Sequence, residues 1–241
     1  MRACFAFAAS LVAPPRCVVC KAATGPRNDL CAHCEAELQA SRPSLVAVPG
    51  VDVAWSAARY AGVAGGLVAA IKFGHLLPPA SRAARRIIEA APPALIDGTV
   101  VPVPAAPLRL RMRGFDAAEE IAHELSRLSG CRMTACLRRA DGPRQVGRPR
   151  GERLASPPRV TVRGKAPREA VLVDDVVTTG ATLAACALAL RGAGAERVVA
   201  VTFASSEKRL ALRPGERSLW ERDERRDRAD RDQRTQPRGH R

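Results

Sequence analysis

The chain has 241 residues, of which 46% are hydrophobic and only 3% aromatic. This composition suits one domain with a small attachment, and it excludes a short peptide, a large multidomain enzyme and a disordered or collagen-like chain. The longest apolar stretch, residues 3–13, is interrupted by Ser10. Because a membrane-spanning helix needs roughly 20 apolar residues, no membrane span is expected.

The chain is strongly basic, with a formal net charge of +15. Residues 207–241 hold 12 Lys and Arg against 8 Asp and Glu, so the first 206 residues still carry +11. This excess charge favours a phosphate-rich partner, either nucleic acid or a polyphosphorylated small molecule.

The first 14 residues combine Arg2 with a short apolar run, a pattern that secretion signals share. Pro14 and Pro15 stand where cleavage of such a signal would be expected. We therefore predict a short amphipathic N-terminal helix over residues 1–14 that covers part of the core.

Four of the eight cysteines form two pairs, each with a two-residue gap: Cys17, Cys20, Cys31 and Cys34. Such spacing lets both thiolates of a pair bind one ion, so residues 15–40 are predicted to form a module around a closed structural zinc site. Two disulfides, or cysteines that merely pack, are the alternatives. The other cysteines are scattered, which fits a reducing compartment and predicts a cytoplasmic location.

The main domain is predicted over residues 41–206, and its first residues, 41–43, are predicted to be a linker. Apolar periodicity and turn residues predict, in chain order, a strand at 51–60, helices at 65–72 and 80–90, a strand at 99–104, a helix at 115–128, a strand at 170–173, a helix at 182–191 and a strand at 197–203. The polar segment at residues 138–158 is too long for an ordinary connection and suggests a lid or disorder. Buried strands alternating with helices predict an α/β fold with a parallel sheet flanked by helices.

The last segment, residues 207–241, differs in kind from the rest. Its residues 221–232 alternate acidic and basic side chains with almost no apolar residue, so they cannot build a core. A disordered or charge-laced extension is favoured over a nucleic-acid-binding tail, because the acids nearly balance the arginines.

The most informative segment joins the apolar strand at 170–173 to the helix at 182–191. Two acids, Asp174 and Asp175, follow the strand, and the turn before the helix contains the residues Thr178, Thr179, Gly180, Ala181 and Thr182. Free N–H groups and the dipole of a helix N-terminus favour an anion there, and adjacent acids suit the hydroxyls of an attached sugar. The pattern indicates a ribose-phosphate site. An acidic cap followed by an ordinary turn is the alternative, and a Walker-type loop is excluded for want of a Gly-Lys-Ser/Thr ending.

This turn resembles the motif with which type I phosphoribosyltransferases bind 5-phosphoribosyl-1-pyrophosphate (PRPP), and the chain resembles the ComF/GntX-like family among them. The similarity runs from Cys17 to about Ala204. Besides the cysteine pairs and the turn, it rests on Ile71-Lys72-Phe73-Gly74, Val101-Pro102-Val103-Pro104, Arg113-Gly114-Phe115, Gln145 and Glu152-Arg153.

The resemblance implies a parallel sheet like that of type I phosphoribosyltransferases. It also implies a role for the residues of each motif. Asp174 and Asp175 would hold the ribose hydroxyls, and residues 178–182 the 5′-phosphate. The pyrophosphate loop would comprise Lys72, Phe73 and Gly74. Residues 138–153 would be the loop that closes over the sugar, with Arg153 as a cation there. The implied catalytic residues are Asp174, Asp175, Lys72 and Arg153, and Mg²⁺ would accompany PRPP.

The chain also departs from the family pattern. Asp116 and Ala117 stand where the family has an Asn-Gln pair, and no Asn-Val pair follows Arg153. These changes concern the acceptor and the lid, whereas the PRPP turn is intact. Without the resemblance, Lys72 is equally compatible with a solvated helix end and Arg153 with a plain loop residue.

Two alternative functions are consistent with these motifs. The first is a phosphoribosyltransferase that joins PRPP to an unidentified nitrogenous acceptor and releases pyrophosphate. The second is a non-catalytic PRPP or nucleotide sensor that engages single-stranded DNA or the DNA-uptake and helicase machinery of competence, as the family association implies. Retention of Asp174, Asp175 and Lys72 favours the first. The sequence leaves open the acceptor and the oligomeric state, with a homo-oligomer as one alternative.

Overall fold

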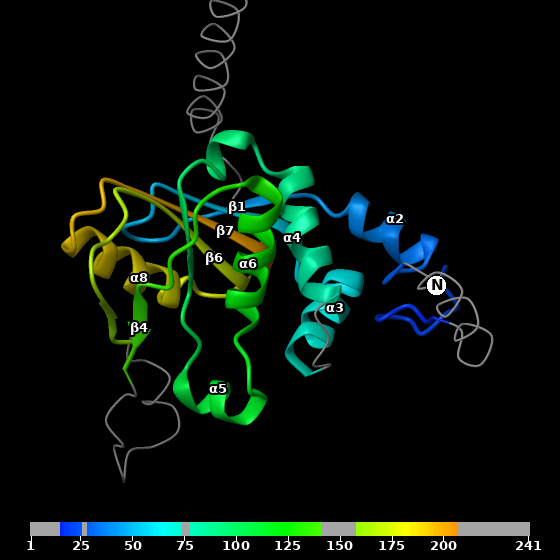
Figure 1. Cartoon of the computed structure of the whole chain (residues 1–241). Helices are drawn as coiled ribbons and strands as arrows, with labels where there is room; N and C mark the ends of the chain where they lie inside the picture. The colour runs from blue at the N-terminus through cyan, green and yellow to red at the C-terminus, as the bar shows by residue number, and fades with distance from the viewer. Residues whose placement is uncertain (1–14, 26–27, 74–77, 141–157, 207–241) are drawn as a thin grey trace, which may run out of the picture. The chain divides into compact units, whose positions relative to one another are not determined.

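The computed structural model describes residues 15–25, 28–73, 78–140 and 158–206 (Figure 1). Several sequence predictions lie outside these ranges: the N-terminal helix at residues 1–14, Gly74, Gln145, Arg153, most of the expected lid, and the tail at 207–241. Of the helices in the described ranges, none is long and apolar enough to cross a membrane.

The central sheet has five strands within the described residues, in the order β1-β2-β7-β6-β3. Their bounds are β1 (Ser44–Val46), β2 (Val53–Arg59), β3 (Thr99–Pro102), β6 (Glu169–Val177) and β7 (Arg197–Ser205). Strands β2, β7, β6 and β3 are parallel, whereas β1 pairs with β2 in the antiparallel sense. The predicted parallel sheet is therefore mostly parallel, with one antiparallel edge strand that the sequence did not reveal.

The two central strands explain why the sheet forms where it does. Most residues of β6 and all but one of β7 are buried, as expected of parallel strands covered on both faces. Along β6, Val171 and Val173 belong to one core cluster and Leu172 to the other. Because successive side chains of a strand point to opposite faces, these clusters are the two sides of the sheet.

Helices cover both faces of the sheet, which makes a three-layer α/β arrangement (Figure 1). The helices α3 (Gly62–Phe73), α4 (Pro78–Ala90) and α6 (Ala117–Ser129) supply residues to the first cluster. Leu183 and Leu190 of α8 (Ala181–Gly192) belong to the second cluster. These four helices match the predicted ones, although α3 begins three residues earlier than expected.

Several short elements were not predicted. They are the helices α2 (Ala32–Ala40) and α5 (Pro107–Arg113), the single turn η1 (Pro93–Leu95), and the hairpin of β4 (Leu137–Arg139) with β5 (Val160–Val162). Three-residue strands carry too little periodicity to be recognised, and α5 has no buried residue. The segment expected to be a lid or disordered from residue 138 starts instead as a strand, because Arg138 and Arg139 of β4 pair with Thr161 and Val160 of β5.

Candidate functional site

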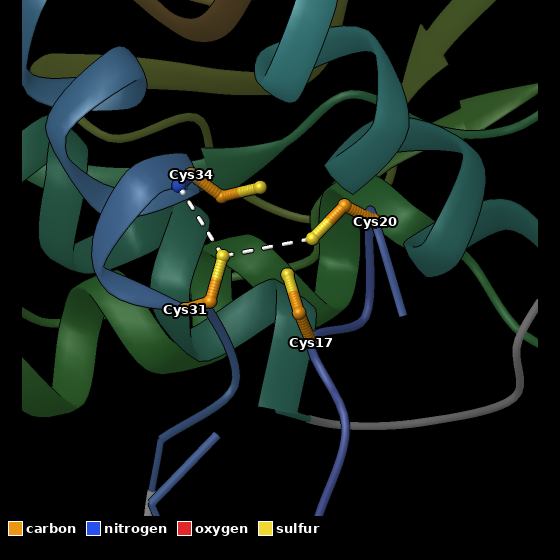
Figure 2. Close-up of side chains that lie close together, drawn as sticks. All are labelled: Cys17, Cys20, Cys31 and Cys34. Carbon is orange, nitrogen blue, oxygen red and sulfur yellow. Dashed lines mark hydrogen bonds between the residues drawn. The ribbon is translucent and has the colours of Figure 1, made fainter. Parts of the chain in front are cut away.

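The four predicted cysteines lie together beside the main domain. Figure 2 shows their side chains converging on one point, and their four sulfur atoms all lie within 4.8 Å of one another. The sulfurs of Cys20 and Cys31 are 3.5 Å apart, far longer than the roughly 2.05 Å of a disulfide. A tetrahedral zinc site with Zn–S bonds of about 2.3 Å separates its sulfurs by about 3.8 Å. The cluster therefore fits zinc.

The local backbone explains how the cysteine pairs are held. The first pair stands in a tight turn, where Cys17 N–H donates to the Ala22 carbonyl at 2.8 Å and Lys21 takes a positive φ of 64°. The second pair begins α2. Cys31 is the N-cap of that helix, and its sulfur accepts from the Cys34 backbone N–H at 3.5 Å. A turn and a helix start thus present the four thiols from two sides.

The thiols of the cluster respond differently to their surroundings. Burial opposes ionisation of Cys17, but backbone N–H groups, led by that of Cys20, lower the pKa of its thiol to about 6. The Cys34 backbone N–H also lowers the pKa of Cys31. In contrast, burial and then the neighbouring thiols raise the pKa of Cys34. Four adjacent thiolates therefore need a dication, which zinc supplies.

The second candidate region is the connection from β6 to α8. Asp175 is buried, whereas Thr178 and Thr179 are exposed on the turn. An open pocket is lined by Asp174, Val176, Val177, Thr178, Thr179, Gly180, Ala181, Thr182 and Leu183. The first N–H groups of α8 have no partner inside the helix. Threonines and the N-terminus of α8, the positive end of the helix dipole, thus line one small pocket, and the Ala181 backbone N–H donates to Oγ1 of Thr179 there at 3.5 Å.

Gly180 is required at its place in this turn. It is the N-cap of α8 in the left-handed conformation, with φ of 69°, a region that residues with a Cβ rarely adopt. A Cβ there would also lie 2.9 Å from Cγ2 of Val48. The glycine therefore lets Val48, in the segment after β1, approach the turn between β6 and α8 closely.

Lys72 comes from the last turn of α3 and reaches the end of β6. Its Nζ lies 2.7 Å from Oδ2 of Asp175, and only 21% of the lysine side chain and 10% of the aspartate side chain are exposed. The Asp175 backbone N–H donates to Oδ1 of Asp174 at 2.8 Å. The implied pyrophosphate-loop lysine and the two implied ribose-binding acids therefore form one connected group.

The carboxyl of Asp174 has a perturbed proton affinity. Burial, followed by the charge of Asp175, raises the pKa of Asp174 well above its usual value, and Lys72 offsets this only in part. Like charges this close disfavour double ionisation. Ionisation of Asp174 therefore costs free energy in the folded chain.

Phe73, which follows Lys72 in the chain, contacts a cation from α5. Phe73 is 69% exposed, and the guanidinium carbon of Arg113, at the end of α5, lies 5.2 Å from the centre of its ring. The structure thus brings Arg113 of the Arg-Gly-Phe motif beside Phe73 of the Lys-Phe motif. The cation–π distance is within the usual range of about 6 Å.

Asp116 has a structural role that the sequence analysis missed. It is the N-cap of α6, where its carboxylate accepts from Ala118 N–H at 3.0 Å and from Ala105 N–H at 2.7 Å. Burial raises the pKa of this carboxyl. Asp116 thereby ties the segment after β3 to α6. An acid just before an amphipathic helix is an N-cap signal that could have identified this role.

The structure thus brings together Asp174, Asp175, Lys72, Phe73 and the turn at residues 178–182. The binding and catalytic roles of these residues stay predictions.

Comparisons with known proteins address the cysteine cluster alone. Residues 8–48 match the family model of the double zinc ribbon domain. The comparison with curated proteins finds no match. The family match and the sulfur geometry both support a structural zinc at Cys17, Cys20, Cys31 and Cys34.

Proposed function

We propose that this chain binds PRPP with Mg²⁺ and transfers the phosphoribosyl group to a nitrogenous acceptor, with release of pyrophosphate. One observation carries the proposal. Strand β6 carries two adjacent acids, Asp174 and Asp175, near its C-terminal end, and Asp174 lines one pocket together with the threonines of the following turn and the first residues of α8. This combination suits a sugar attached to a phosphate, as the ComF/GntX-like resemblance implies.

Each side chain has a defined task in such binding. The hydroxyls and N–H groups at residues 178–182 would donate to the 5′-phosphate. Asp174 and Asp175 would accept hydrogen bonds from the ribose hydroxyls. These carboxylates also fit the oxygen ligands that Mg²⁺ takes, and Mg²⁺ would supply charge neutralisation for the leaving pyrophosphate.

The reaction forms a bond from the acceptor nitrogen to ribose C1 and breaks the bond from C1 to the pyrophosphate oxygen. The electron pair of the broken bond leaves with pyrophosphate, and the acceptor nitrogen loses its proton. Negative charge grows on the leaving group, so a fixed cation such as Lys72 stabilises the transition state more than the ground state. Its placement 2.7 Å from Asp175 supports this task.

The test is calorimetric titration of Mg²⁺-PRPP into the zinc-loaded protein. Wild type is expected to bind saturably, and the double variant Asp174→Asn/Asp175→Asn to lose binding by on the order of 100-fold or more, because two hydrogen-bonding acids are neutralised. Glu169→Gln, an exposed acid at the other end of β6, is the matched control. A folded wild type that does not bind contradicts the proposal. Pyrophosphate release in an acceptor screen then separates turnover from binding.

A second function, recognition of single-stranded DNA, is favoured by α5. Figure 1 shows this helix projecting from the chain between β3 and α6. It has no buried residue, and Arg109 and Arg111 are exposed on it. Arginines bind the phosphate backbone. If the chain binds DNA here, Arg109→Ala/Arg111→Ala weakens binding to an oligonucleotide and reduces its salt dependence, whereas PRPP binding is unchanged.

A further inference from the structure

Helix α3, which carries Lys72 at its end, is weak by its own sequence. Its interior contains Gly65 and Gly66, and each glycine in a helix interior costs roughly 0.5–1 kcal/mol relative to alanine. Its start is also poor, since Ala61 stands in the N-cap position and accepts the first bond from Gly65 N–H. Alanine has no side-chain acceptor for the free N–H groups of the first turn.

The missing cap comes from the cysteine module. Oε1 of Glu37, a residue of α2, accepts a hydrogen bond from the Val63 backbone N–H at 3.0 Å. An N-cap side chain normally serves this N–H, and a carboxylate there also complements the helix dipole. A Cβ at Gly62 would collide with the same oxygen. The glycine therefore makes room for an acid from a distant segment.

A second contact follows one turn later. Val19 lies between the first two cysteines, and a Cβ at Gly66 would lie only 2.6 Å from its Cγ1. A Cβ at Gly65, in contrast, would meet no atom within 4 Å. Leu38 of α2 and Leu67 of α3 belong to the same buried cluster. The module thus holds the first half of α3 by a cap, a packed valine and a shared core.

We propose that Glu37 is a positioning residue for the PRPP site. It caps α3 and, together with the Val19–Gly66 contact, holds the helix whose last turn places Lys72 against Asp175. The cysteine module thereby affects the affinity of the site through α3. This inference rests on the proposed function.

Glu35 provides a matched control within the same helix. Its carboxylate pairs with Arg82 of α4 rather than with α3. Glu35→Ala therefore removes one acid from α2 and one contact with the main domain, but it leaves the start of α3 capped. Glu37→Gln is the conservative variant, because its amide oxygen retains an acceptor for Val63 N–H.

The experiment measures zinc content and Mg²⁺-PRPP affinity for wild type, Glu37→Ala, Glu37→Gln and Glu35→Ala. All four are expected to hold one zinc. Glu37→Ala is expected to bind PRPP about fivefold more weakly, the fold-change that corresponds to loss of one helix cap. Glu37→Gln restores most of the affinity, and Glu35→Ala binds like wild type. Should Glu37→Ala not fold, Val19→Ala tests the same helix through its second contact.

A double-mutant cycle separates positioning from general destabilisation. If Glu37 acts through Lys72, Glu37→Ala has no further effect on affinity in a Lys72→Met background. An undiminished effect in that background overturns the inference, as do equal losses in Glu37→Ala and Glu35→Ala. A wild type that does not bind PRPP overturns the proposed function and this inference with it, so the two failures are distinguished by the wild-type titration.

Discussion

The cysteine module and the β6–α8 site are built in opposite ways. All four thiols of the module come from residues 17–34, and a turn and one helix start hold them. The second site combines the end of β6 with Lys72 from α3, next to Phe73 and Arg113. A local site is specified by spacing, whereas a site assembled from distant elements depends on how those elements pack. The two sites should therefore fail differently when they are perturbed.

The largest effect is expected at the module. Cys34 is a buried member of the cluster, so Cys34→Ser leaves an incomplete site and should weaken zinc binding by on the order of 100-fold or more, beyond the 10–100-fold of outer-shell changes. Because binding of a structural zinc is folding free energy, the melting temperature should also fall. Zinc content by atomic spectroscopy and calorimetric melting measure both.

Cys131→Ser is the control for this prediction. The Cys131 thiol lies outside the cluster and donates to the Ile96 carbonyl at 3.2 Å, a bond that a serine hydroxyl can keep. This variant should retain one zinc per chain. If Cys34→Ser held zinc as tightly as Cys131→Ser does, the four-cysteine site would be wrong.

An effect of intermediate size is expected for substitution of Asp174. Unlike loss of a cysteine, it should raise the melting temperature. Its pKa in the folded protein is raised, mainly by burial, so the carboxyl favours folding at pH values below its unfolded pKa of about 3.9 and that contribution is lost as pH rises through the folded pKa. Asp174→Asn removes the charge. The variant should melt higher than wild type at pH 7, by about 2–4 °C per kcal/mol gained, while it loses affinity for Mg²⁺-PRPP.

Calorimetric melting between pH 3 and pH 8 measures this difference. The gap between variant and wild type should narrow toward pH 3, where both side chains are neutral. A variant that is less stable than wild type at pH 7 would show that Asp174 supports the fold instead of a ligand.

The smallest effect on stability is expected at the contact between the cysteine module and helix α3. Gly65→Ala should raise the free energy of unfolding by about 0.5–1 kcal/mol, because alanine favours the helix and its Cβ enters open space. Gly66→Ala should lower it by about 1 kcal/mol or more, since the new Cβ would press on Val19. Chemical denaturation measures both variants. Equal effects of the two substitutions would argue against the packed contact.

The difference between a local cluster and a site assembled from distant elements also explains what could be predicted from sequence. The cysteine spacing predicted the cluster because its geometry is local. The apolar runs of β6 and β7 and the periodicity of α4, α6 and α8 predicted these elements because burial imposes those patterns. In contrast, the residue pattern alone gave Lys72 no partner, since its contact with Asp175 depends on the packing of α3 beside the sheet. Only the family resemblance grouped these two residues in one site.

Other features left weaker signals in the sequence. Helix α5 buries no residue, so its sequence has no apolar periodicity from which the helix could be predicted. The antiparallel strand β1 has three residues and followed a stretch interpreted as a linker. The caps of α3 and α6 differ instructively: Asp116 stands next to the helix that it caps and was recognisable, whereas Glu37 caps α3 from another segment of the chain.

Hydrogen exchange of the zinc-loaded wild type, with and without saturating Mg²⁺-PRPP, tests the location of the site most directly. If the β6–α8 turn binds the 5′-phosphate, exchange should slow at the backbone amides of residues 178–183 and at the end of α3 near Lys72. The cysteine module should show no comparable direct protection at residues 17–34. Protection confined to the module, or unchanged exchange at residues 178–183 under saturating ligand, would contradict the proposed site.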